Sequence, residues 1–344
     1  MVRVMFVLLL LVTACADAEP EGLGEPDVRP PSIVAATSEG AVVADNAAEA
    51  FYGLDRAGRE VWRDSPAYKS GTLAICQARC PDAVFSGSLE AEGPDPAPRT
   101  PRGAFTTSDS RVRRVLTARG ASDAVIAEGD GAGKGSLRLI RPSGQATRVP
   151  VDDVAGVAWA EDASRTSAVA TSGGRVLWFR HDRAGWREVA RAGLDGPGVA
   201  ACTSGGTAVI TGEQTHLLTM AGKRTPVATD LETVTGCVAG GMNVAVFAHW
   251  QDGAGNRHTG IRGLDGQGRP VWKRDIAAEA RVGAHPFGTA FVIAHGGAVE
   301  VVDAAGRTLA THAGAVSAAY TPAGELVLLN ASGKISWLPA QPPA

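Results

Sequence analysis

Along most of the chain, apolar residues alternate with polar or small residues in short runs that have a period of two. Val, Ala, Leu, Thr and Trp dominate these runs, and Gly-rich segments connect them. Such runs are typical of β-strands joined by tight turns. No stretch has a convincing helical period, so the sequence predicts an all-β protein.

The strands belong to a repeated unit whose most recognisable part is a tight turn of the form Asp-x-x-Gly between two strands. In such a turn Gly supplies a positive φ, and Asp bonds to its own backbone. The two best copies are Phe51–Trp62 and Ile261–Trp272. Further copies are Leu137–Gly144, Leu177–Val189, His216–Gly222 and Val299–Leu309.

The turn glycines follow one another at intervals of roughly 40 residues, which is the signature of a repeat architecture. The interval after Gly58 is about twice as long, so we expect it to hold a degenerate copy. That copy would comprise Thr72–Cys76, Asp82–Ser88 and Gly103–Thr107, interrupted by a Pro-rich insertion. A final partial copy spans Ala315–Leu338, which gives about eight units.

A unit of four short antiparallel strands cannot bury both of its faces by itself. Packing the units face to face around an axis buries both faces and leaves only short edges. The sequence therefore predicts a β-propeller over residues 32–340 with eight blades, or alternatively seven, each a four-stranded antiparallel sheet. Because the last copy has few strands, residues Ser32–Thr37 are expected to pair with it and close the ring.

The copies that end in Trp62 and Trp272 carry the motif Leu-Asp-x-x-Gly-x-x-x-Trp. With one residue fewer before Gly, this motif resembles the signature of quinoprotein-like (PQQ-like) propeller repeats. In that family the tryptophan docks between blades, which implies a blade-docking role for Trp62 and Trp272. WD40 repeats are the nearest alternative, but the chain lacks their Gly-His and Trp-Asp dipeptides. It also lacks the adjacent cysteine pair of quinone-dependent enzymes, so no cofactor is expected.

Residues 1–14 have the features of a bacterial lipoprotein signal peptide. Arg3 precedes nine apolar residues, Val4–Val12, which is fewer than the about 20 that cross a bilayer. Val12-Thr13-Ala14-Cys15 resembles the lipobox, which implies that Cys15 carries lipid such as palmitate; the alternative is an ordinary secretory signal with a chance cysteine. Residues 15–31 are rich in acid, Pro and Gly, and we expect a disordered tether. The chain is thus expected at the extracytoplasmic face of the cell membrane.

Four cysteines remain besides Cys15, and four cysteines allow three pairings. Cys202 and Cys237 occupy the same place in two consecutive repeats, so we expect them to form a disulfide. Cys76 and Cys80 would then form the second one, as a short Cys-x-x-x-Cys loop. A redox or metal site at this loop is the less favoured reading, because two ligands do not make a zinc site.

Charge and candidate chemistry narrow the function only in part. The net charge is −3, no basic face is implied, and a nucleic-acid partner is not expected. Only five of the 33 basic residues are Lys, and with abundant Ala, Gly and Val this indicates a high-GC, actinobacterial genome. The Gly129–Ser136 segment lacks the spacing of a phosphate loop, and Asp252–Asn256 lacks the further acids of a calcium loop.

Scattered histidines and tryptophans offer two further candidate sites. His249, His258 and His285 could hold a metal only if they converge, and otherwise they are loop or rim residues; no metal is expected. The remaining tryptophans either line a sugar- or peptide-binding face or pack between blades, and packing between blades is the favoured interpretation. These tryptophans are Trp159, Trp178, Trp186, Trp250 and Trp337.

Two functions remain open from the sequence. The favoured one is a non-catalytic module at the cell surface that binds or scaffolds protein partners, because propellers present loops on two faces around a channel. The alternative is an extracytoplasmic hydrolase or lyase with its site at the central channel. No residue is assigned a catalytic role.

Overall fold

The computed structural model describes residues 30–45, 48, 50–64, 84–86, 112–119, 123–129, 132–227, 233–241, 243–251, 254, 256–265, 267–277 and 280–340. All regular secondary structure in these residues is β-strand, as the sequence pattern predicts. No helix in this part of the chain is long and apolar enough to cross a membrane. The strands form antiparallel sheets, which we number as blades in chain order.

Five blades have four strands, and strands that follow each other in the chain are neighbours in the sheet. Blade 1 contains β1 (Ser32–Ala36), β2 (Gly40–Asp45), β3 (Ala50–Asp55) and β4 (Glu60–Asp64). Blade 3 contains β10 (Ala158–Glu161), β11 (Ser167–Ser172), β12 (Arg175–Asp182) and β13 (Gly185–Gly193). Blade 4 contains β14 (Gly198–Ser204), β15 (Thr207–Gly212), β16 (His216–Thr219) and β17 (Arg224–Pro226).

Blades 5 and 6 repeat the same order. Blade 5 contains β18 (Thr233–Gly240), β19 (Asn243–Gln251), β20 (Arg257–Leu264) and β21 (Pro270–Asp275). Blade 6 contains β22 (Arg281–Ala284), β23 (Ala290–His295), β24 (Ala298–Asp303) and β25 (Thr308–Ala313). Blade 7 has three strands: β26 (Ala315–Tyr320), β27 (Leu326–Asn330) and β28 (Ile335–Leu338).

Blade 2 has five strands: β5 (Val84–Ser86), β6 (Val112–Arg119), β7 (Asp123–Gly129), β8 (Gly135–Ile140) and β9 (Ala146–Val151). The degenerate copy expected between the first two turns lies outside the described residues, except for β5, which joins this sheet. The described residues therefore form seven sheets, and the count of eight blades is not confirmed.

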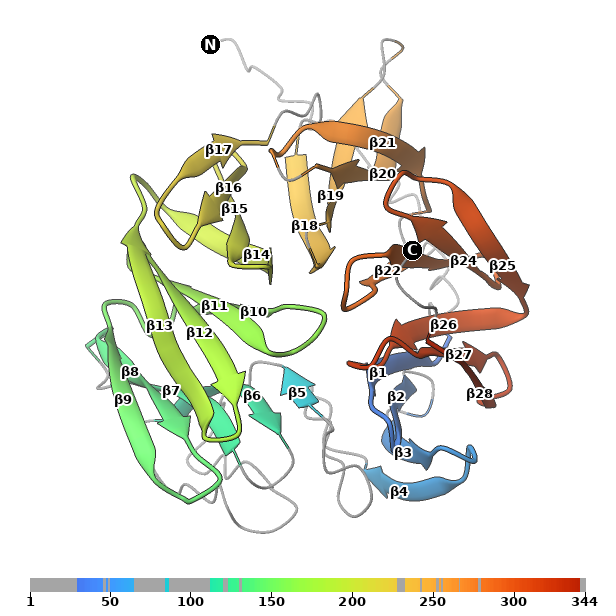
Figure 1. Ribbon diagram of the computed structural model, residues 1–344, viewed down its shortest axis with the longest axis horizontal. Helices are drawn as coiled ribbons and strands as arrows, with labels where there is room; N and C mark the ends of the chain where they lie inside the picture. Colours follow the sequence, from blue (N-terminus) through green and yellow to red (C-terminus); the bar gives the residue numbers. More distant parts are fainter. Residues whose placement is uncertain are drawn as a thin grey trace, which may run out of the picture.

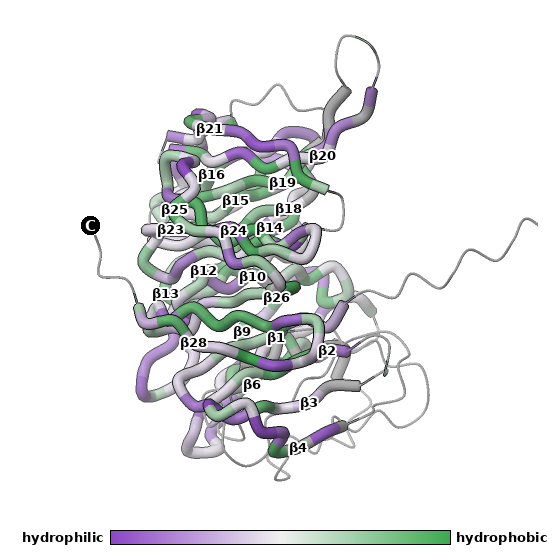
Figure 2. The backbone as a smooth tube through the Cα atoms, turned by 90° about the vertical axis from the view of Figure 1, so that its right-hand side faces the viewer, coloured by the Kyte–Doolittle hydropathy of each residue, from purple (hydrophilic) through white to green (hydrophobic). Residues whose placement is uncertain are grey.

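The sheets stand around a central axis as the blades of a propeller (Figure 1), with the first strand of each four-stranded blade nearest the axis. Middle strands such as β7 and β11 are buried on both faces, because each blade packs between two neighbours. Outer strands such as β21 alternate between exposed and half-buried residues, and their hydrophilic stretches lie at the outside of the molecule (Figure 2).

Apolar clusters between consecutive blades form the core. Each cluster draws its buried side chains from two neighbouring sheets: blades 2 and 3, 3 and 4, 4 and 5, 5 and 6, 6 and 7, and 7 and 1. Burial of apolar surface at about 25 cal/mol per Å² makes these interfaces the main source of stability. This is the face-to-face packing that the repeat predicts.

The expected closure by Ser32–Thr37 is wrong. β1 pairs with β2 of its own sheet and is not an added strand of blade 7. The ring closes instead through side chains, because β1 packs beside β26, and the backbone N–H of Ile33 donates to Ser317 Oγ at 3.1 Å. Because β1 is the first strand of blade 1, it does not add a fourth strand to blade 7.

The Asp-x-x-Gly turns join the third and fourth strands and have a more specific form than the sequence pattern suggested. In the turn of blade 1, Asp55 accepts bonds from the backbone N–H groups of Ala57 and Arg59 and from Arg59 Nε, all at 2.8–2.9 Å. Gly58 adopts a φ of 76°, which favours glycine. The same contacts recur around Asp265 and Asp303, so the motif is Asp-x-x-Gly-Arg.

Candidate functional site

A cavity of about 450 Å³ lies on the axis of the ring. The first strands of six blades line it, and eight of the lining residues are Ala or Gly. These small residues are Ala160, Ala163, Ala201, Ala239, Gly283, Ala284, Ala318 and Ala319. The channel therefore exposes much backbone and few functional groups.

Four ionisable side chains line the same channel: Glu161, Asp162, Arg165 and Tyr320. Asp162 holds the turn after β10, since it accepts bonds from the backbone N–H of Thr166 at 2.9 Å and from the Ser164 hydroxyl at 2.8 Å. Glu161 accepts a bond from Trp159 Nε1 at 3.2 Å. Burial raises the pKa of Tyr320 to about 12, so its phenol is a proton donor at neutral pH.

Arg165 is the single non-glycine residue with a positive φ (58°) in the described chain. A backbone in this region is strained for a residue with a β-carbon. Arg165 lines the channel, and its backbone N–H donates to Asp162 O at 2.9 Å. The described residues contain no cluster of three or more His, Cys, Asp or Glu side chains that could hold a metal ion.

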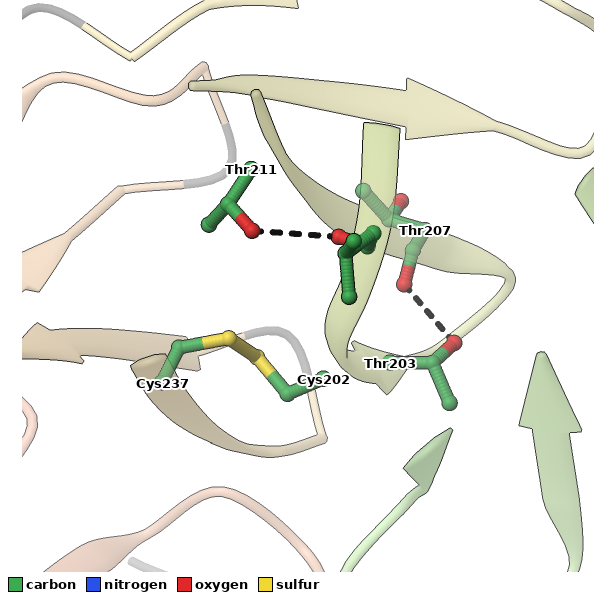
Figure 3. The surroundings of a disulfide bond; sticks show 6 residues. Cys202, Thr203, Thr207, Thr211 and Cys237 are labelled. Atoms are coloured by element: carbon green, nitrogen blue, oxygen red, sulfur yellow. Dashed lines mark hydrogen bonds between the residues drawn. A yellow bond between two sulfur atoms is a disulfide. The ribbon is translucent and has the colours of Figure 1, made fainter. Parts of the chain in front are cut away.

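A disulfide joins Cys202 of β14 to Cys237 of β18, with 5.7 Å between the Cα atoms. Both cysteines line the channel, so the bond links the innermost strands of blades 4 and 5 (Figure 3). These are the two cysteines that the repeat alignment pairs. Cys15, Cys76 and Cys80 lie outside the described residues, and their expected lipid and disulfide stay predictions.

The turns that follow the innermost strands of blades 4, 5 and 6, which we call the inner turns, are bonded to one another at one end of the channel. The hydroxyl of Ser204 donates to Gly241 O at 2.5 Å, and Asn243 Nδ2 donates to Gly288 O at 2.6 Å. A Cβ atom at Gly240 would lie 1.9 Å from the carbonyl oxygen of His285, so only glycine fits there. The inner turns thus form a fixed rim.

Phe287 stands out on this rim because 58% of its surface is exposed. It belongs to the inner turn of blade 6, and its backbone N–H donates to Nδ1 of His285 at 3.2 Å. His285 is 2% exposed and packs edge-on against Tyr320, with 4.7 Å between ring centres. Burial lowers the pKa of His285, partly offset by the Gly324 backbone, so a neutral imidazole supports the turn that presents Phe287.

The three histidines that could have held a metal by converging make separate contacts. His249 of β19 is exposed and bonds to Thr259 Oγ1 at 2.9 Å. His258 of β20 lies 3.7 Å from Asp275. His285 supports the rim, in another blade.

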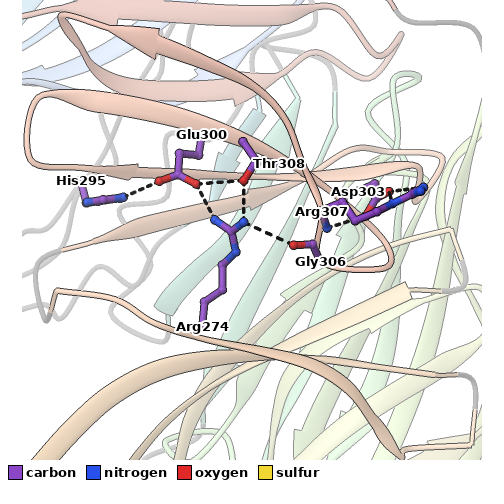
Figure 4. Close-up of polar contacts among 7 residues, drawn as sticks. All are labelled: Arg274, His295, Glu300, Asp303, Gly306, Arg307 and Thr308. Atoms are coloured by element: carbon purple, nitrogen blue, oxygen red, sulfur yellow. Dashed lines mark hydrogen bonds and ion pairs between the residues drawn. The ribbon is translucent and has the colours of Figure 1, made fainter.

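Trp272, for which the resemblance implies a docking role, contacts the neighbouring blade 6. Its indole Nε1 donates to Ala304 O of blade 6 at 3.0 Å, and its ring lies 5.9 Å from that of Phe291. Beside it, Arg274 reaches from blade 5 to Glu300, to Gly306 O and to Thr308 Oγ1 of blade 6 (Figure 4). The side chains of Trp62 and Trp250 lie outside the described part of the molecule.

The other tryptophans pack in the interfaces between blades, in agreement with the favoured reading. Trp159 and Trp186 lie 5.5 Å apart in the cluster of blades 2 and 3, and Trp178 belongs to that of blades 3 and 4. Trp337 packs into the cluster of blades 7 and 1. The sequence pattern did not single out Phe287. It also did not single out the Arg after the turn glycine, although the three occurrences of Gly-Arg could have indicated it.

Comparisons with known proteins find similarity to solved structures alone. No family model matches the sequence, and no curated protein matches it. Among solved structures, "Crystal structure of BBS1N in complex with ARL6DN" is 13% identical with a TM-score of 0.47, covering 91% of this chain and 98% of that one. Hsv2 of Kluyveromyces lactis is 13% identical with a TM-score of 0.43, covering 86% and 87%. Streptogramin B lyase is 12% identical with a TM-score of 0.41, covering 93% and 96%.

Proposed function

We propose that this chain is a lipid-anchored β-propeller at the extracytoplasmic face of a bacterial cell membrane, and that it binds a protein partner without catalysis. The observation that carries the proposal is Phe287, a large aromatic side chain that is 58% exposed on a fixed turn. Aromatic residues are enriched at the centres of protein interfaces because they bury a large area at a low cost in conformational entropy.

The chemistry of the rim supports binding more than turnover. Asn243 and Gly241 of blade 5 bond to the inner turn of Phe287, so this turn would lose little backbone entropy on binding. Eight of the residues that line the channel are Ala or Gly, and Asp162 is engaged in its own turn. Lipid on Cys15 would hold this rim near the membrane surface.

Proximity labelling at the native cell surface tests the proposal. We expect specific neighbours of the wild-type chain, and we expect their loss on Cys15→Ala release and on Phe287→Asp substitution. Val271→Asp is the matched control, because Val271 is 54% exposed on the outer strand β21, away from the rim. Equal loss in both aspartate variants, or no specific neighbour at all, would contradict the proposal.

A further inference from the structure

The edge of blade 7 differs from the outer edges of blades 1, 3 and 5. The outer strands of blades 1, 3 and 5 carry both signs of charge, as in Glu60 and Arg63 or in Lys273 and Asp275. Charged side chains on an edge strand discourage pairing with another chain. β28 reads Ile-Ser-Trp-Leu and carries no charge, and it is the last strand of its sheet in the described part of the chain.

The backbone register identifies the groups on this edge. Asn330 N–H donates to Lys334 O at 3.0 Å, and Leu328 faces Ser336 in the next bonded pair. Residues of an antiparallel strand point their N–H and C=O groups alternately to the two sides. The polar backbone groups of Ser336 and Leu338 therefore face β27, and those of Ile335 and Trp337 face outward.

Two cavities follow the same strand, between blades 6 and 7. The larger one, of about 570 Å³, lies at the start of β28, and the smaller one, of about 90 Å³, lies at its end. His312 of β25 lines both. The register of the outer strands explains this space. In blade 5, Trp272 of the fourth strand lies opposite Gly263. In blade 6, Ala310 occupies the equivalent position opposite Val301, so the small alanine side chain replaces the indole ring.

The one permanently charged side chain that lines this groove is positive. It is the exposed Lys334, and the side chains that line the two cavities include no Asp or Glu. The chain's own residues before β1 are poor candidates for the added strand, because prolines at 20, 26, 30 and 31 cannot donate to a ladder. A partner strand with an acidic residue complements the groove better.

We propose that β28 receives an extended, acidic peptide strand of a partner protein, which pairs antiparallel with Ile335–Leu338 as the fourth strand of blade 7. The backbone groups of Ile335 and Trp337 supply the ladder, and the groove beside Lys334 and His312 selects side chains. This inference rests on the proposed protein-binding function but uses another surface than Phe287.

Amide hydrogen exchange of the full chain tests the pairing, with a synthetic ten-residue probe of alternating Val and Thr between terminal Glu residues. We expect the probe to slow exchange about fivefold or more at Ile335 and Trp337, and to leave Ser336 and Leu338 nearly unchanged. A probe with Pro at its centre is the matched control and should protect neither. Lys334→Glu should weaken binding by about two- to fivefold, whereas Lys223→Glu, on a turn of blade 4, should not.

Three outcomes overturn the inference. One is protection of β25 equal to that of β28, because this would be unspecific edge pairing. Another is slow exchange of Ile335 and Trp337 in the free chain, which would mean that the chain covers its own edge. The third is self-association through β28 without probe binding. If any of these occurs while Phe287-dependent neighbours persist at the cell surface, the protein-binding function stands and only this site is wrong.

Discussion

The interface between blades 5 and 6 and the interface between blades 7 and 1 hold neighbouring sheets together by different means. In the first, Trp272 lies against the backbone of Gly263 and Gly306, where added Cβ atoms would lie 2.0 Å and 2.6 Å from indole atoms. In the second, the guanidinium of Arg56 stacks 4.8 Å from the ring of Trp337 and forms two bonds with Glu325.

The difference follows from the distance along the chain. Trp272 and its acceptor Ala304 are 32 residues apart, whereas Arg56 and Glu325 are 269 residues apart. A contact that closes a longer loop costs more entropy, although the cost grows slowly with length. The first interface belongs to the repeat, and the second is specific to the point where the ring closes. We therefore expect the closing interface to open first.

The largest effect is expected at a third interface, between blades 4 and 5. Loss of its disulfide should change which interface opens first. Replacing Cys202 and Cys237 by Ser removes a link with a sequence separation of 35, worth about 4 kcal/mol in the loop-entropy account. Blades 4 and 5 should then separate before blades 7 and 1. Denaturant unfolding measures the loss, and hydrogen exchange of β14 and β18 locates it. Unchanged stability in the double variant would contradict this expectation.

Trp272→Ala should have the next largest effect, about 3 kcal/mol of the free energy of unfolding, because it removes a half-buried ring and leaves a cavity between two sheets. Leu309→Ala is the control, since Leu309 is 49% exposed on the outer strand of blade 6. It should cost less than about 0.5 kcal/mol. If Trp272→Ala is as stable as this control, the packing of Trp272 between blades 5 and 6 contributes little to the free energy of unfolding.

Arg56→Met should weaken the closing interface by about 1 kcal/mol or less, because the side chains of Arg56 and Glu325 are 50% and 20% exposed. The wild-type chain should approach the variant as salt concentration rises, since ions screen exposed pairs. Urea unfolding at low and high NaCl measures this. Arg183→Met, in the exposed turn after β12, should show no such salt dependence.

Acid should produce the smallest effect, and it should act on the closing interface. The bond from Arg56 lowers the pKa of Glu325 below its ordinary value of 4.5. Its stabilising contribution is therefore complete above about pH 5 and is lost as pH falls through the lowered pKa. Glu325→Gln should flatten the dependence of the unfolding midpoint on pH below 5, and Glu213→Gln, on an exposed turn, should not. If the unfolding midpoints of wild type and Glu325→Gln change with pH in the same way, the expected role of Glu325 is wrong.

The repeat could be predicted because its signals are local. Period-two runs gave strands, and Asp55, Gly58 and their counterparts marked the same turn in blades 1, 5 and 6. The pairing of Cys202 with Cys237 followed from their equal positions in two repeats. The docking role expected for Trp272 rests on the resemblance of its repeat to a known motif, because no spacing rule distinguishes a docking side chain from a core side chain.

The candidate site was less accessible to the same reasoning. Phe287 has no periodic or motif signal, and its exposure depends on how three inner turns pack. His285 looked like one of three scattered histidines, yet burial in the rim makes it a support for Phe287. The expected pairing of Ser32–Thr37 failed because β1 completes its own sheet first.

The sequence by itself determined the strands, their turns and the stacking of similar units around an axis, because each depends on residues close together in the chain. The lipid expected on Cys15 rests on a local sequence resemblance and stays a prediction. Only the tertiary structure decided how the ring closes, which side chains meet on the channel and its rim, and that the edge of β28 lies beside a groove lined by Lys334. These features join residues from different blades, and their energies depend on distances that no local pattern encodes.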